Sequence, residues 1–102
     1  MDNEFILCAA VWFPVKLKFE FQPDDVETGL VICGLRHGNC FAMKALLCDS
    51  LRDIIKHVPP KQGFLTNKNR FVDRFEAARI AKAANQAKDI QLGDELVSED
   101  LW

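Results

Sequence analysis

The stretch NRFVDRFEAARIA, residues 69–81, places Arg70 and Arg74 on either side of a predicted helix start. A helix N-terminus carries a partial positive charge and unpaired backbone N–H groups, so it attracts phosphate. Two guanidinium groups would add forked donors that match the geometry of a phosphate. Alternatively, Asp73 satisfies the first helical turn and pairs with a neighbouring arginine, or both arginines are solvated. The residues leave both interpretations open, an anion site and a charged surface.

A second set of chemically capable side chains lies in GLRHGNC, residues 34–40, directly after an apolar stretch. Loops that follow strands often carry functional groups, so Arg36 is a candidate ligand contact. His37 and Cys40 could form a thiolate–imidazole pair, but nothing marks an orienting third residue, and Cys40 also suits a buried helix start. Glycine-rich phosphate loops and the common hydrolase motifs are absent from the sequence. We therefore expect a binding protein and not an enzyme.

The four cysteines are Cys8, Cys33, Cys40 and Cys48. Together with His37, three of them have a spacing that offers zinc ligands, but the paired C-x2-C pattern of a zinc knuckle is missing. In a cytosolic protein they are expected to be free thiols with a structural role. We expect no metal and no cofactor.

Length and composition favour one folded domain spanning residues 1–102, with 49% hydrophobic and 27% charged residues. The longest apolar run, from Phe5 to Val15, contains Pro14 and is too short to span a bilayer. It also lacks the basic start of a signal peptide. These features predict a cytoplasmic protein without a membrane partner.

Charge is segregated along the chain. Residues 36–88 carry eleven basic and four acidic groups, a net charge of +7, whereas the two flanking segments carry −4 and −5. A basic middle suits a phosphate-bearing ligand. Equally, the acidic ends could neutralise it within the chain or across a subunit interface. A pI of about 5.6 argues against a nucleic-acid partner.

Three strands are predicted in the first third of the chain. Residues 4–13 are rich in strand-forming residues, and Pro14 ends the strand. Residues 15–21 alternate apolar and charged side chains, which predicts a half-buried strand. Residues 30–35 form a third, apolar strand.

Two helices and a hairpin are predicted in the remainder. The first helix runs from about Cys40 to Val58, with Asn39 as its cap and two prolines after it. A hairpin with a turn at residues 67–69 follows, and then a helix over residues 74–88, capped by Asp73 with Glu76 three residues later. The expected fold is α+β, a small antiparallel sheet with two helices.

The second predicted helix has a face of small residues, Ala77, Ile80, Ala81, Ala84 and Ala87. Such a face lets another helix approach closely, either in the same chain or in another subunit. A helix-mediated homo-oligomer is one expectation, and packing within the chain is the other.

Three segments together resemble a known family: GLRHGNC, QGFLTNKNRFVDRFEAARIAKAANQ and SEDLW, at residues 34–40, 62–86 and 98–102. The chain is similar to the first type of Thoeris anti-defence protein, small phage proteins that sequester cyclic ADP-ribose-type signals made by bacterial TIR enzymes. The sequence departs from the family pattern at Phe75, where a second acidic or polar residue is expected.

The resemblance implies a cyclic nucleotide ligand, bound in the host bacterial cytosol without being cleaved. It also implies a dimer or higher homo-oligomer with ligand sites between subunits. The residues that match the family's motifs, and are therefore implied as ligand-binding, are Arg36, His37, Gln62, Phe64, Arg70 and Arg74. Under this hypothesis, a pyrophosphate supplies the negative charge that the arginines lack, and Arg74 is its strongest contact.

Two other function classes remain open. The acidic tail or an apolar surface could bind a host protein directly, which would make the chain a small protein inhibitor. A hydrolase using His37 and Cys40 is the third hypothesis.

Overall fold

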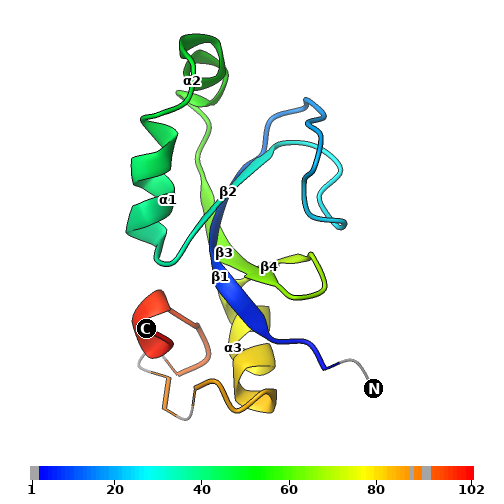
Figure 1. Ribbon diagram of the computed structural model, residues 1–102, viewed down its shortest axis with the longest axis vertical. Helices are drawn as coiled ribbons and strands as arrows, with labels where there is room; N and C mark the ends of the chain where they lie inside the picture. Colours follow the sequence, from blue (N-terminus) through cyan, green and yellow to red (C-terminus); the bar gives the residue numbers. More distant parts are fainter. Residues whose placement is uncertain (1–2, 88, 91–92) are drawn as a thin grey trace.

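The computed structural model describes residues 3–87, 89–90 and 93–102, and Figure 1 shows helices placed around a central sheet. All strand pairs are antiparallel, in the spatial order β2-β1-β3-β4. This confirms the α+β class and the small antiparallel sheet. Three α-helices and one 3-10 turn are present among the described residues, one helix more than expected. The strands are β1 (Ile6–Phe13), β2 (Leu30–Gly34), β3 (Lys61–Thr66) and β4 (Phe71–Asp73).

Strand β1 lies in the middle of the sheet and is covered on both faces. Its alternate residues Ala9 and Val11 are buried, and so is Ala10 between them. A strand covered on both sides needs a continuous apolar run, and the sequence supplies one. The predicted strands at residues 4–13 and 30–35 are therefore confirmed.

The predicted strand over residues 15–21 is wrong. This segment begins a loop that leaves the sheet after Pro14 and returns at β2 (Figure 1). Phe21 is 99% exposed and has a φ of 60°, which a strand residue does not adopt. Alternating side chains form a strand only where a neighbouring strand pairs with the backbone, and none lies beside this segment.

The single helix predicted over residues 40–58 is two helices, α1 (His37–Lys44) and α2 (Asp49–Ile55). Cys48, between them, has an extended backbone. Leu47 packs against the core beside this break and Ile55 is fully buried, so tertiary packing of both residues outweighs a continuous helical periodicity. The predicted cap is also displaced, since Arg36 is the N-cap and its backbone N–H donates to Asn39 Oδ1 at 2.9 Å.

The β3–β4 hairpin turns at residues 67–69 as predicted, with Asn69 in the left-handed region. Helix α3 (Arg74–Ala83) starts at the predicted Asp73 cap, whose carboxylate accepts from the Glu76 backbone N–H at 2.8 Å. It ends earlier than expected, because Asn85 takes a φ of 57° and closes the last turn. Position 88, the predicted end, lies outside the described residues.

The small-residue face of α3 packs within the chain. Ala77 and Ala81 are completely buried against the sheet. In-chain packing therefore accounts for this face, and the expectation of an oligomer has to rest on other surfaces.

The C-terminal segment folds back beside the start of α3 (Figure 1). Leu96 is fully buried, and its backbone N–H donates to the Arg74 carbonyl at 3.0 Å. The 3-10 turn η1 (Ser98–Asp100) follows. Among the helices in the described part of the chain, none is long and apolar enough to cross a membrane.

Candidate functional site

Four elements that are distant in the sequence surround one pocket of about 560 Å³. They are the start of α1, strand β3, the start of α3 and the turn η1. Four of the six predicted site residues line it, together with residues of the C-terminal segment. Its charged and polar side chains are Arg36, His37, Asn39, Gln62, Arg74, Ser98 and Glu99.

Arg74 has a hydrogen-bond donor in this pocket that no described residue satisfies. It is the first residue of α3, and one terminal nitrogen donates to Gln62 Oε1. Its Nε atom is buried and has no hydrogen-bond partner among the described residues. No carboxylate in the described part of the chain forms an ion pair with it. A buried cationic donor without an acceptor costs free energy, and an anionic ligand would remove that cost.

His37 is held in a defined orientation at the back of the pocket. Its Nε2 lies 2.8 Å from the Gly63 carbonyl oxygen, and its ring meets Phe64 edge-to-face at 5.0 Å. Because a carbonyl only accepts, Nε2 carries the proton, and Nδ1 can only accept. The single proton of the Ser98 hydroxyl is shared between His37 Nδ1 and Glu99 Oε2, each 3.3 Å from the Ser98 oxygen.

His37 is neutral at neutral pH. Burial is the largest effect and lowers its pKa below the ordinary value. The hydrogen bond to Gly63 and the Glu99 charge oppose this, while the Arg74 charge lowers the pKa further. The positive charge of the pocket therefore comes from arginine.

Arg36 occupies the rim of the pocket. It is the N-cap of α1, directly after β2, and its guanidinium donates to the backbone carbonyl of Trp102. This contact ties the C-terminal segment to the site. The remaining guanidinium donors give the pocket a second cationic group beside Arg74.

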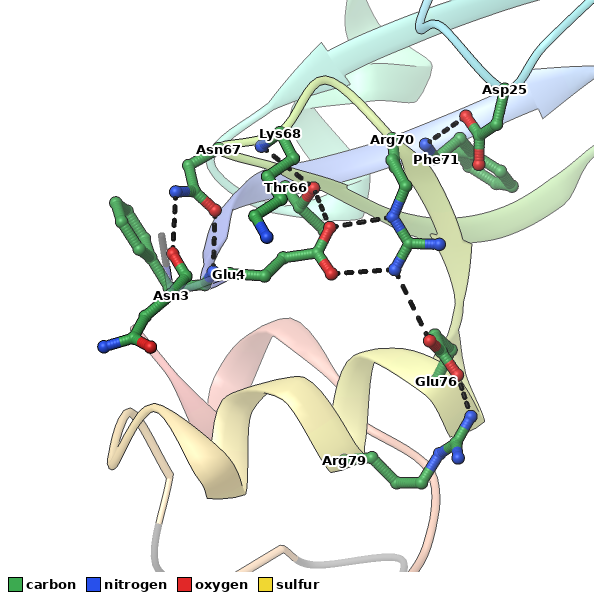
Figure 2. A network of polar contacts seen from close by, with 11 residues as sticks. Asn3, Glu4, Asp25, Thr66, Asn67, Lys68, Arg70, Phe71, Glu76 and Arg79 are labelled. Atoms are coloured by element: carbon green, nitrogen blue, oxygen red, sulfur yellow. Dashed lines mark hydrogen bonds and ion pairs between the residues drawn. The ribbon is translucent and has the colours of Figure 1, made fainter. Parts of the chain in front are cut away.

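The other two predicted residues lie elsewhere. Phe64 is fully buried beneath His37, so it supports the imidazole and offers no free ring face. Arg70 does not line the pocket. Its Nε and a terminal nitrogen each donate to a Glu4 carboxylate oxygen at 2.8 Å, and Glu76 lies 3.4 Å away (Figure 2). The two arginines that suggested one shared anion site are thus separated.

The Arg70 network borders a larger, open depression of about 1260 Å³. Glu4, Arg70, Glu76 and Arg79 already satisfy one another in a connected chain of ion pairs (Figure 2), and Lys68 is a further cation on the lining of the depression. The smaller pocket is the better candidate site, since the buried Nε of Arg74 lacks a hydrogen-bond partner among the described residues.

Ser98 and Glu99 belong to the pocket and were not predicted individually. The only sequence signal for them was the SEDLW segment, which carried part of the family resemblance. Cys40 is turned away from His37, with its thiol against the carbonyl oxygens of Ala9 and Arg36, both at 3.6 Å. Burial raises the pKa of this thiol to about 11, so Cys40 is a poor nucleophile.

The zinc interpretation gains no support from the geometry. Among the described residues, no three His, Cys, Asp or Glu side chains gather in an arrangement that could hold a metal ion. Cys48 is exposed at the start of α2, whereas Cys40 is buried at the start of α1.

Comparison with protein families matches residues 5–102 to the family described as Phage T4 y16D protein. No curated protein and no solved structure shows significant similarity to the chain. The match covers nearly the whole sequence, including every element that lines the pocket. The chain belongs to the phage T4 y16D protein family.

Proposed function

We propose that this phage-family protein binds a cyclic ADP-ribose-type nucleotide in the pocket around Arg74 and sequesters it without cleaving it. The observation that supports the proposal most is the buried Arg74 Nε, which has no acceptor among the described residues. A phosphate oxygen is an acceptor of the right charge. In this role the protein counters a host defence signal by stoichiometric capture.

Pocket size and composition agree with a nucleotide-sized ligand. A volume of about 560 Å³ falls in the range of small-molecule sites. Arg36 and Arg74 supply two guanidinium groups for a pyrophosphate, and Glu99 offers a carboxylate for ribose hydroxyls or a base amino group. Most contacts come from helix starts and a strand, so little ordering is needed on binding.

The test is titration calorimetry with cyclic ADP-ribose isomers made by a TIR enzyme. Replacing Arg74 by alanine removes the guanidinium group and its buried Nε, and should weaken binding about 100-fold, as expected for loss of a hydrogen-bonded charged partner. Arg52→Ala is the matched control, because Arg52 lies on α2 and pairs with Asp49 outside the pocket. Full affinity in Arg74→Ala, or no binding of any isomer to the unaltered protein, contradicts the proposal.

A second candidate function rests on the Ser98–His37 hydrogen bond. In a phosphate-ester hydrolase, the Ser98 oxygen would attack phosphorus while His37 Nδ1 takes its proton and passes it to the leaving oxygen. Water would then release the phosphoryl group from Ser98. Recovery of the nucleotide by heat release distinguishes the two functions. Unchanged nucleotide supports capture, whereas a cleaved product that disappears in Ser98→Ala supports hydrolysis.

A further inference from the structure

Cys8 and Cys33 lie together on neighbouring strands. The β1–β2 register pairs Ala10 with Cys33, and Cys8 is two residues before Ala10, so both cysteines lie on one face of the sheet. Cys8 is therefore the diagonal neighbour of Cys33, and the Cys33 side chain and the Gly34 backbone N–H both act on the Cys8 thiol. Cys33 is exposed on the edge strand β2, and Cys8 is half-buried. A small reagent in solvent can therefore reach the pair.

The two thiols differ in acidity. The hydrogen bond from Cys33 is the main cause that lowers the pKa of Cys8 to about 7, with the Gly34 N–H acting in the same direction. The same hydrogen bond raises the pKa of Cys33. The pair as a whole thus loses its first proton more readily than an ordinary thiol and holds the second more tightly. This is the arrangement in which thiol–disulfide exchange is fast.

The other two cysteines lack this arrangement. Cys40 is buried, and its thiol lies against backbone carbonyl oxygens. Cys48 is exposed, but its sulfur lies 3.3 Å from the Ser50 hydroxyl and not beside another cysteine. The described structure therefore sets the first pair apart from the remaining cysteines.

We propose that Cys8 and Cys33 form a redox-active dithiol, which closes to an intramolecular disulfide when it meets a low-molecular-weight disulfide such as oxidised glutathione. The Cys8 thiolate attacks one glutathione sulfur, and a first reduced glutathione leaves. Cys33 then loses its proton and attacks the Cys8 sulfur of the mixed disulfide, which releases a second glutathione. The protein loses two electrons and two protons, and the glutathione disulfide takes them up. This inference is independent of nucleotide binding.

The test is to incubate the reduced, full-length protein with oxidised glutathione and to map peptides by mass spectrometry without reduction. We expect a protein lighter by two hydrogen atoms and one cross-linked peptide pair containing Cys8 and Cys33. The reaction should accelerate as the pH rises through about 7, because the Cys8 thiolate population grows. Cys48→Ser is the matched control and should form the same disulfide at the same rate.

Cys8→Ser and Cys33→Ser should each stop at a glutathione adduct or not react. Three results overturn the proposal: a stable glutathione adduct on the unaltered protein, a disulfide that includes Cys40 or Cys48, or no reaction of Cys8 at any pH tested. Because the unaltered protein gives the primary result, a folding defect in either serine variant does not weaken the test.

Discussion

Arg70 and Arg74 are four positions apart, yet their neighbours give them different roles. Arg70 meets two carboxylates, and the salt bridge to Glu4 joins the N-terminal segment to the β3–β4 hairpin (Figure 2). Arg74 meets the amide of Gln62 and keeps a buried donor without a partner. Arg70 therefore joins two segments of the fold, whereas Arg74 keeps a donor that no described residue satisfies.

Replacing Glu4 by glutamine should lower the free energy of unfolding at neutral pH by about 1 kcal/mol, the size expected for a partly exposed ion pair with good geometry. The hydrogen bond to Arg70 is the main cause that lowers the pKa of Glu4 to about 2 from an unfolded value near 4.5. This stabilisation is full above pH 4.5 and is lost as the pH falls towards 2.

Urea denaturation at a series of pH values measures this difference. Glu20→Gln, in the exposed loop before β2, is the control and should behave as the unaltered protein. Equal stability of Glu4→Gln and the unaltered protein at pH 7 would contradict the role given to this ion pair.

Strand β3 connects the hairpin to the pocket through Gly63. A Cβ atom there would lie 2.2 Å from the Val72 carbonyl oxygen and 2.7 Å from Phe71 Cζ. The Gly63 carbonyl also orients His37. The backbone at Gly63 therefore affects both the packing of β3 against β4 and the orientation of His37 in the pocket.

Gly63→Ala should lower the free energy of unfolding by about 1–3 kcal/mol, because β3 and β4 have to separate to admit the methyl group. Gly38→Ala is the matched control. Nothing lies within 4 Å of a Cβ at Gly38, which is in α1, so alanine there should leave stability unchanged or raise it. Thermal denaturation compares the two, and equal melting temperatures would show that the contact at Gly63 is harmless.

Features set by neighbouring residues were more predictable in this chain than features set by distant contacts. The apolar runs of β1 and β2, the hairpin turn and the Asp73 cap depend on residues close together in sequence. The break between α1 and α2 depends on where Leu47 and Ile55 meet the core, and residues 15–21 lacked a partner strand. The hydrophobic periodicity of a segment identifies its apolar face, but it does not identify the element that packs against that face.

Large apolar side chains stay exposed over much of the surface of the single chain. They include Phe41, Met43, Leu46 and Ile54 on and between α1 and α2, and Phe21 in the loop before β2. Burying such groups between subunits is favourable by about 25 cal/mol for each Å² removed from water. This surface supports the expectation of a homo-oligomer, which α3 does not.

Sedimentation velocity should therefore detect a dimer or larger species at micromolar concentration. Leu46, 76% exposed, is the residue to change, since Leu46→Glu should shift the protein towards monomer if this surface is buried between subunits. Thr28→Glu, at an exposed position in the loop before β2, is the control for one added negative charge. A protein that is monomeric throughout contradicts the oligomer prediction.

Local structure could be inferred from the residues alone. The sequence predicted the α+β class, the helix capped by Asp73 and the tight hairpin turn. Each depends on groups a few positions apart. The family resemblance grouped six residues as ligand-binding. Four of them, Arg36, His37, Gln62 and Arg74, line one pocket, whereas Phe64 and Arg70 do not.

Contacts between distant residues decided the rest. His37 and Ser98 are 61 positions apart, and Arg70 and Glu4 are 66 apart. Neither hydrophobic periodicity nor the spacing of residues in the sequence predicts such pairs. They form only when the sheet brings neighbouring strands and the C-terminal segment together. For the same reason, the burial of Phe64, the unpartnered nitrogen of Arg74 and the pairing of Cys8 with Cys33 emerged only from the folded chain.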